Sequence, residues 1–275
     1  MRCLSPATRA GEAVQQGSLS ENFQFFVGLH QPSDAQHFKR CMVSYNRLKT
    51  RKSDFRVGKW MMDSGAFTEI STHGHYREGV EGYAAAIIRW ASCGQLMAAV
   101  SQDYMCEPMI LRKTGLTIAD HQRLTIERYD AIRALVPSSI HILPVIQGYL
   151  PEHYAAHVAQ YGARLVPGMW VGVGSVCKRN GSPREMAAVL RAIRHVCSDL
   201  RLHGFGAKTT ALESVEVRGL LSTADSMAWS YHARKNGRDA NSWREAAAFA
   251  DRISRPLSSP IRPMDAYWSI DYAAD

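Results

Sequence analysis

The sequence predicts an α/β fold, a single (β/α)8 TIM barrel with an irregular N-terminal lead and a C-terminal helical tail. Eight short apolar runs alternate with longer helical patterns, and eight is the number of strands that a closed barrel needs. The length of 275 residues suits one such barrel, and a hydrophobic content of 46% supplies a large core. A doubly wound open sheet is the alternative, but no glycine-rich phosphate loop follows the first expected strand.

The expected strands lie, in chain order, at Phe25–Leu29, Met42–Tyr45, Trp60–Met62, Leu96–Ser101, Ile142–Ile146, Trp170–Val173, Leu202–Phe205 and Thr223–Met227. The expected helices lie at Tyr83–Ala91, Ala119–Val136, Glu152–Tyr161, Pro183–Val196 and Ala211–Leu220. Ser182 before Pro183, with Glu185 close behind, is a typical helix start. The first two connections, 29–42 and 45–60, are short and only weakly helical. The alternation predicts a parallel sheet covered by helices.

We expect three segments along the chain: a lead over residues 1–22, the barrel over residues 23–230, and a helical extension over residues 231–275 that packs on the barrel. No run approaches ~18 consecutive apolar residues, so no membrane-spanning helix is expected. The N-terminal residues lack the apolar core of a signal peptide, and we expect the protein in the cytoplasm. Six scattered cysteines without a CxxC pair are typical of reduced thiols in or near a core.

The positive charge of the chain, +8 in total, is concentrated in one segment. Between Lys39 and Lys59 there are eight Lys or Arg residues and a single acid. Such a run favours contact with phosphates, although a solvated loop is the alternative. The residues that we expect to bind phosphates are Arg47, Lys49, Arg51 and Lys52.

Polar residues follow the expected strands at the points where the strands end. They include the pairs Asp63-Ser64, Gln102-Asp103, Gln147-Gly148, Gly174-Ser175 and Asp225-Ser226. A single polar residue after a strand is usually a cap for the next helix, but three strands that end in Asp form a stronger set. Because TIM barrels build their active sites at the carboxyl ends of the strands, the sequence predicts a polar pocket with several carboxylates.

Four short motifs occur in the order found in tRNA-guanine transglycosylases: MDSGAF at residues 62–67, VIQG at 145–148, VGVG at 171–174 and ADS at 224–226. The sequence more closely resembles their DNA-modifying relatives, the DpdA-type deazapurine transglycosylases, in QDYMCEP at 102–108, GVGSVC at 172–177, HGFG at 203–206 and DSMAWS at 225–230. The resemblance implies a pentosyltransferase that exchanges guanine in DNA for a 7-deazaguanine derivative such as 7-cyano-7-deazaguanine.

Base exchange breaks an N-glycosidic bond at C1′ and remakes it on the same face of the sugar. A carboxylate nucleophile does this by two displacements through a covalent sugar intermediate, as in retaining glycosidases. A second carboxylic acid protonates the departing guanine and deprotonates the incoming base. The resemblance implies that Asp225 is the nucleophile and Asp63 the general acid/base. The alternative for each is a structural aspartate.

Guanine offers hydrogen-bond donors at N1 and at its 2-amino group, and an acceptor at O6. An ionised Asp103 would accept from both donors, while Gln147 and a backbone N–H near Gly172 or Gly174 would donate to O6. The base-binding residues predicted on this ground and from the motifs are Asp103, Gln147, Gly148, Gly172, Gly174, Ser64 and Phe67. For stacking on the base, the candidates are Phe67, Tyr104 and Met227, with a place in the core as the alternative.

No cofactor is expected to be required. The tRNA enzymes carry a structural zinc site of three cysteines and a histidine near the C-terminus, and this chain has no cysteine after Cys197, so that site is absent. Cys106, Cys177 and His203 lie in family-like motifs and are candidates for a different zinc site. His203 is expected at the wrong end of its strand for the catalytic pocket.

The expected partners are DNA and a 7-deazaguanine base as co-substrate, in a bacterial cell or a phage-infected host and without a membrane. A guanine in a duplex would have to be flipped out, which is compatible with an accessory protein that opens the duplex. One alternative is the same chemistry on tRNA. Two others are a nucleic-acid-binding barrel without catalysis and a barrel enzyme that acts on a small metabolite.

Overall fold

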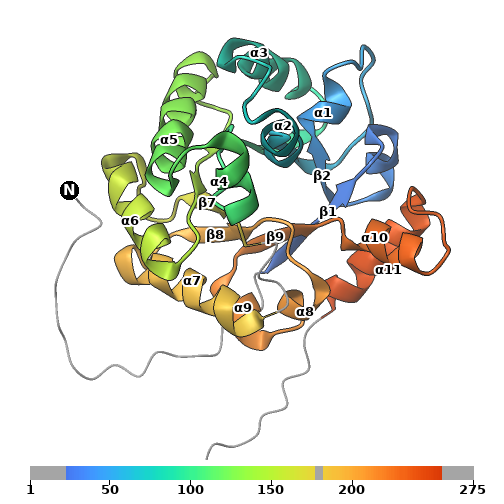
Figure 1. The fold of residues 1–275 in the computed structure, drawn as a ribbon. Coiled ribbons are helices and arrows are strands. Elements are labelled where there is room, and N and C mark those ends of the chain that lie inside the picture. The colour runs from blue at the N-terminus through green and yellow to red at the C-terminus, as the bar shows by residue number, and fades with distance from the viewer. Residues whose placement is uncertain (1–22, 177–181, 256–275) are drawn as a thin grey trace, which may run out of the picture.

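The computed structural model describes residues 23–176 and 182–255, which form a ring of strands surrounded by helices (Figure 1). The predicted lead over residues 1–22, the candidate ligand Cys177 and residues 256–275 lie outside the described residues.

Within the described residues, nine strands form one parallel sheet in the order β5-β4-β3-β2-β1-β9-β8-β7-β6. Their bounds are β1 (Gln24–Leu29), β2 (Arg40–Ser44), β3 (Lys59–Asp63), β4 (Gln95–Val100), β5 (Ile142–Leu143), β6 (Val145–Ile146), β7 (Trp170–Val173), β8 (Arg201–Gly204) and β9 (Thr223–Ser226). Each expected strand overlaps one of these ranges, apart from one that is divided in two. The predicted TIM-type α/β barrel is confirmed.

Pro144 divides the expected strand Ile142–Ile146 into β5 and β6, because proline has no N–H to give to a sheet. The backbone at and beside Pro144 still forms hydrogen bonds with both neighbouring strands. Ser101 donates its N–H to Leu143 on one side at 3.1 Å, and Gly172 donates to Pro144 on the other side at 2.8 Å. This broken strand therefore closes the ring between β4 and β7.

The helices of the described residues are α1 (Tyr45–Leu48), α2 (Ala66–His73), α3 (Val80–Trp90), α4 (Pro108–Thr114), α5 (Ile118–Leu135), α6 (Pro151–Tyr161), α7 (Pro183–Val196), α8 (Thr209–Leu212), α9 (Val215–Leu220), α10 (Ala228–Lys235) and α11 (Trp243–Ser254), with short 3₁₀ turns η1 (Pro32–His37) and η2 (Gly162–Arg164). None of these helices is long and apolar enough to cross a membrane.

The sequence signals for helix starts explain two of these boundaries. Helix α7 has the predicted range, and Ser182 caps it by accepting the N–H of Glu185 at 3.3 Å. The expected helix Ala211–Leu220 is instead the pair α8 and α9. A second cap divides it, because the Ser214 hydroxyl accepts the N–H of Val217 at 3.4 Å and starts α9.

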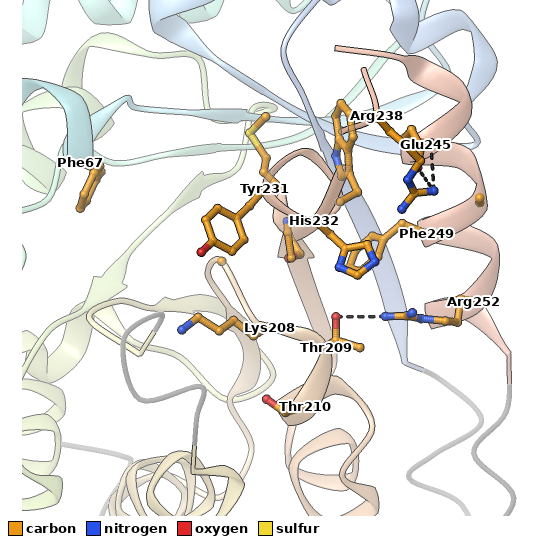
Figure 2. Close-up of a pocket in the computed structure, with 16 residues that line it drawn as sticks. Phe67, Lys208, Thr209, Thr210, Tyr231, His232, Arg238, Glu245, Phe249 and Arg252 are labelled. Carbon is orange, nitrogen blue, oxygen red and sulfur yellow. Dashed lines mark hydrogen bonds and ion pairs between the residues drawn. The ribbon is translucent and has the colours of Figure 1, made fainter. Parts of the chain in front are cut away.

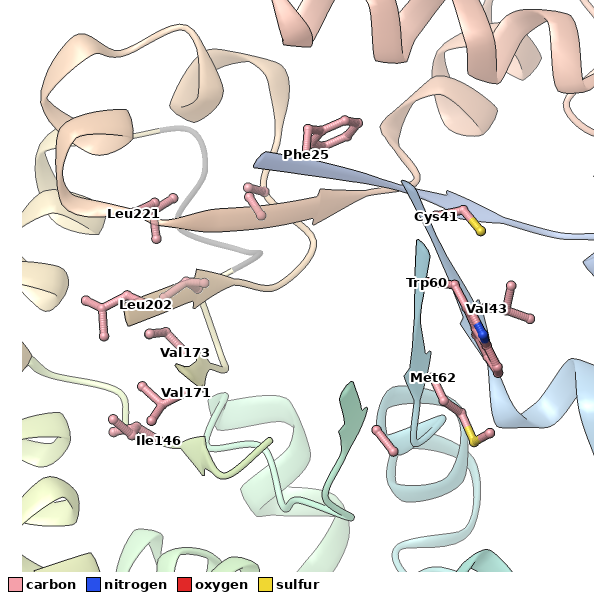
Figure 3. Close-up of a cluster of buried hydrophobic side chains, with 14 of the residues drawn as sticks. Phe25, Cys41, Val43, Trp60, Met62, Ile146, Val171, Val173, Leu202 and Leu221 are labelled. Carbon is pink, nitrogen blue, oxygen red and sulfur yellow. The ribbon is translucent and has the colours of Figure 1, made fainter. Parts of the chain in front are cut away.

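Side chains alternate between the two sides of each strand, so the barrel has an outer and an inner core. The outer core packs between the strands and the helices and includes Phe25, Val43, Trp60, Val171 and Leu202 (Figure 3). The inner core fills the barrel with Phe26, Met42, Met61, Ala98, Val100, Leu143, Val145 and Trp170.

The inner positions become polar toward the carboxyl ends of the strands. Ser44 follows the inner residue Met42 by two positions in β2, and Asp63 follows Met61 by two positions in β3. The parallel register places Ser44 and Asp63 side by side. Because the side-chain period along a strand is two, both face the barrel interior, above an apolar floor.

The two C-terminal helices pack on the barrel beside β1 (Figure 1). The rings of Phe25 and Phe249 meet edge to face, with centroids 5.8 Å apart. Arg218 of α9 donates to the carbonyls of Ile253 at 2.6 Å and Arg255 at 3.0 Å. A buried guanidinium thus satisfies carbonyls that the end of α11 leaves without helical partners.

Candidate active site

A cavity of about 410 Å³ lies at the carboxyl ends of the strands. Parallel strands end at the same rim of a barrel, so residues that are far apart in the sequence meet there. Six of the predicted catalytic and base-binding residues line this cavity: Asp63, Phe67, Asp103, Gln147, Gly174 and Asp225. The structure therefore brings both candidate catalytic aspartates and the main candidate base-binding pair into one volume.

Asp225 is the third residue of β9 and is 8% exposed. Its Oδ1 accepts the backbone N–H of Gly206 at 2.9 Å and lies 3.3 Å from Nε2 of His203. Its Oδ2 takes part in no hydrogen bond within the residues that the structure describes. The two donors hold the carboxylate in one orientation and leave one oxygen for the cavity.

A chain of hydrogen bonds behind Asp225 includes both nitrogens of the His203 ring. The Trp170 indole N–H donates to Oγ1 of Thr223 at 2.8 Å, and this oxygen lies 2.8 Å from Nδ1 of His203. An indole nitrogen can only donate, so the threonine hydroxyl is free to give its own proton to Nδ1. With Nδ1 as the acceptor of this bond, Nε2 carries a ring proton and donates to Asp225.

The prediction that His203 lies at the wrong end of its strand for the pocket is wrong. Its side chain points into the barrel, where both ring nitrogens have partners and the ring meets Phe26 edge to face. The other described metal candidate, Cys106, is buried, and burial raises the pKa of its thiol, which disfavours the thiolate that binds metals. No group of three or more His, Cys, Asp or Glu within residues 23–176 and 182–255 could hold a metal ion.

Asp63 ends β3 and is half-buried at the edge of the cavity. Its Oδ2 accepts the N–H of Gly65 at 3.1 Å, in a left-handed turn that starts α2. Burial raises the pKa of Asp63 to about 6, and the negative charge of Asp225 adds to the rise, while a hydrogen bond with Ser44 opposes it. A carboxyl group with this pKa can both give and take a proton near neutral pH.

Asp103 lies in the loop after β4 and is buried against Gln147, whose Nε2 donates to Oδ2 of Asp103 at 2.5 Å. The Tyr76 hydroxyl holds the Asp103 backbone, because it donates to the carbonyl and accepts the N–H, both at 2.9 Å. Burial raises the pKa of Asp103 to about 7, and the charges of Asp63 and Glu107 add to this, while the Gln147 bond opposes it. The sequence predicts an ionised Asp103, and this raised pKa means that the charge is lost as the pH falls through about 7.

Gln147 is held by partners on three sides. Its N–H donates to Nδ1 of His157 and its carbonyl accepts from Nε2 of Gln122, both at 2.8 Å. Burial lowers the pKa of His157 to about 4, so the ring is neutral and Nδ1 can accept. The Ser175 hydroxyl donates to Oε1 of Gln147 at 2.7 Å, from a left-handed backbone with φ 56°. This contact fixes the amide so that Nε2 faces Asp103.

The backbone amides of Gly172 and Gly174 are already used. Gly172 donates to the Pro144 carbonyl at 2.8 Å, and Gly174 donates to the Ile146 carbonyl at 3.0 Å. Both bonds belong to the ladder between β6 and β7. Neither of these two amides is therefore available to O6 of the base, and a backbone donor near them stays a prediction.

Glycines near the cavity act mainly by making room for neighbouring side chains. A Cβ at Gly174 would overlap the amide of Gln147, and a Cβ at Gly148 would lie 2.9 Å from the Tyr154 ring. Gly174 lines the cavity, whereas Gly148 and Gly172 are not among its lining residues. Of the three glycines that the sequence predicts at the base, only Gly174 lines the cavity.

The stacking candidates differ in position. Phe67 is 51% exposed and lines the cavity, as does Met227, whose side chain occupies the space that Gly28 leaves free. Tyr104 is buried with other aromatic residues and does not line the cavity, so the prediction that it stacks on the base is wrong. Ser64 is also buried outside the lining.

The fold divides the basic run. Helix α1 follows the carboxyl end of β2, so Arg47 and Lys49 lie on the side of the cavity. Burial lowers the pKa of His30 at the end of β1, and the charge of Arg47 lowers it further, which places Arg47 near this rim. Arg51 and Lys52 belong to the segment that returns to the amino end of β3. The Arg51 guanidinium there donates to two carbonyls of its own loop.

No local sequence pattern marks the residues that hold the site from behind, chiefly Tyr76, Gln122, His157 and Thr223. None of them directly follows a strand, and each acts on a residue that is distant in the sequence. One signal was present for Gly28. A glycine inside an apolar strand often marks a close approach, which here is that of Met227.

Comparison with known families agrees with this geometry. The sequence model of one family, described as DpdA, DeoxyPurine in DNA protein A, matches residues 21–255. A search of curated proteins finds no match. The family match spans the barrel, the cavity residues and both C-terminal helices. The chain therefore belongs to the DpdA family.

Proposed function

We propose that the protein exchanges guanine in DNA for a 7-deazaguanine base, through a covalent intermediate between the sugar and Asp225. Membership of the DpdA family indicates a transglycosylase of deazapurine modification in DNA. One observation carries the finer proposal: Asp63 and Asp225 line the same cavity, with the pair Asp103 and Gln147 on its wall.

In the first half of the proposed reaction, Oδ2 of Asp225 attacks C1′ of a deoxyguanosine, and the bond from C1′ to N9 breaks. Asp63 gives its proton to the departing guanine, which leaves as the neutral base. The N–H groups of His203 and Gly206 hold Oδ1, so Oδ2 is the attacking atom. The product is a sugar ester of Asp225 and an ionised Asp63.

In the second half, the incoming 7-deazaguanine gives its N9 proton to Asp63 and attacks C1′ from the face that guanine left. The ester bond breaks, and the Asp225 carboxylate is restored. Two displacements at one carbon retain the configuration of the sugar. All atoms and charges balance without a redox step, and the proposed exchange requires no cofactor.

Recognition in this proposal uses Asp103 and Gln147. Guanine and 7-deazaguanine share N1–H, the 2-amino group and O6, and they differ at position 7. An ionised Asp103 accepts from N1–H and the amino group, and Gln147 donates its second Nε2–H to O6. Adenine has an acceptor at N1, an amino donor at C6 and no amino group at C2, so it would leave buried polar groups unpaired, at a cost of about 1–3 kcal/mol each.

We expect labelled guanine to enter DNA with the wild type, and not with Asp225→Asn, which keeps the shape of the site but lacks a nucleophile. Asp63→Asn should lower the exchange rate about 10²–10⁴-fold. The matched control is Asp130→Asn, a carboxylate that pairs with Arg164 outside the barrel. Exchange at the wild-type rate in Asp225→Asn would contradict the mechanism. Incorporation of guanine into tRNA in place of DNA would show that tRNA is the substrate.

The pH dependence of kcat/KM for DNA should be bell-shaped, with its maximum between about pH 6 and 7. The raised pKa of Asp63, about 6, means that its proton is lost above this pH. The raised pKa of Asp103, about 7, means that its charge is lost below this pH. In Asp63→Asn, the residual rate should rise with pH to a plateau, and a persistent alkaline decline would assign that limb to another group.

Neutralising Arg47 and Lys49 together should weaken DNA binding and lower the slope of log K against log salt by about 1.4 on single strands, at ~0.7 per phosphate. The matched double variant of Arg51 and Lys52 should keep the slope, because these residues lie on the segment that leads away from the cavity. Titration by fluorescence anisotropy at several salt concentrations measures both. A lower slope in the Arg51 and Lys52 variant, without one in the Arg47 and Lys49 variant, would contradict this division of the basic run.

A further inference from the structure

A second hollow, of about 770 Å³, lies beside the cavity and shares Phe67, Gly206 and Met227 with it. We call it the α10 groove. Its other walls come from the segment after β8 and from helices α10 and α11, including Lys208, Thr209, Tyr231, His232 and Arg252 (Figure 2). None of the predicted phosphate-binding residues belongs to it.

The α10 groove exposes two aromatic rings. Tyr231 of α10 is 69% exposed and Phe67 of α2 is 51% exposed, which is unusual for side chains of this size. Within the described residues, Tyr231 has no ring contact or side-chain hydrogen bond. Figure 2 shows the Tyr231 ring and the Lys208 ammonium on the same side of the groove as Phe67. Exposed rings beside a cation are typical of surfaces on which nucleic-acid bases stack.

The charge of the α10 groove is positive. Its ionisable lining residues are Lys208, His232, Arg238, Glu245 and Arg252. The single acid, Glu245, is neutralised by Arg238 at 2.9 Å. Arg252 donates to the Thr209 hydroxyl at 3.1 Å and also forms an ion pair with Glu213 at 3.9 Å. The Lys208 ammonium forms no hydrogen bond or ion pair in the part of the chain that the structure describes, and it can bind an external anion.

The residues that line the α10 groove include those that directly follow Asp225 in the sequence. Asp225 is followed directly by Ser226 and Met227, which line the groove, and α10 starts at Ala228. A nucleotide with its C1′ at Asp225 therefore has this groove beside it. The DNA strand must continue from that nucleotide through a phosphate, and a neighbouring positive groove with exposed rings fits the next residue of the strand.

We propose that the α10 groove binds the nucleotide next to the target guanosine in a single DNA strand, with its base on Tyr231 and its phosphate at Lys208. The inference rests on the proposed function, in that it takes Asp225 as the position of the target sugar. Stacking on a ring face does not depend on the identity of the base, so this site positions the strand without reading its sequence.

The test measures binding of a short single-stranded oligonucleotide with one guanosine, by fluorescence anisotropy. Tyr231→Leu keeps a side chain of moderate size but removes the ring, and should weaken binding about tenfold, whereas Tyr231→Phe keeps the ring and should bind like the wild type. Lys208→Met should lower the salt slope by about 0.7. The matched control is Lys59→Met, an exposed lysine at the amino end of β3, which should change neither quantity.

A second oligonucleotide tests whether the base next to the guanosine is the partner of Tyr231. An abasic residue on one side of the guanosine should weaken binding to the wild type by about the same factor as Tyr231→Leu, and should weaken binding to Tyr231→Leu no further. The proposal would be overturned if the losses from the abasic residue and from Tyr231→Leu multiplied, or if Tyr231→Leu bound DNA like the wild type. Tighter binding of tRNA than of DNA would also overturn it. If the wild type exchanges guanine but Tyr231→Leu binds DNA as tightly as the wild type, the proposal for the α10 groove is rejected and the proposed function is not. The expected binding losses in a protein that does not exchange guanine support the groove and reject the proposed function.

Discussion

The site depends on one constraint: along parallel strands that close into a barrel, every second side chain faces the interior. The apolar residues Met42 and Met61 fill the floor, and the next inward positions carry Ser44 and Asp63. The same rule brings Asp225 of β9 to the rim. Because the strands are parallel, their carboxyl ends lie at one rim of the barrel, where Asp63 and Asp225 line one cavity although they are far apart in the sequence.

Four carboxyl groups line the cavity, those of Asp63, Asp103, Glu107 and Asp225, and they would repel one another if all were ionised. Burial and neighbouring charges raise the pKa values of Asp63 and Asp103 to about 6 and about 7. Asp225 instead has two N–H donors on one oxygen, one of them from His203. Different environments for neighbouring carboxyl groups are how one site separates a proton donor from a nucleophile.

The fold and the rim of the site could be predicted because they follow from local patterns. Apolar runs mark the strands, and polar residues at their ends include Asp63, Gln147 and Asp225. The supporting bonds could not be predicted, because they join distant residues: Trp170 and Thr223 are 53 positions apart. The partner of the Gly172 N–H could not be predicted for a related reason, since the carbonyl that accepts it belongs to Pro144, which interrupts the expected strand Ile142–Ile146.

The most direct test of the account is to map the covalent adduct between the protein and DNA. After denaturation and proteolysis of a reaction stopped during turnover, mass spectrometry should find a deoxyribose-linked peptide that contains Asp225, and none in Asp225→Asn. A DNA link at Asp63 or Asp103, or exchange of the base without any covalent adduct, would contradict the proposed role of Asp225.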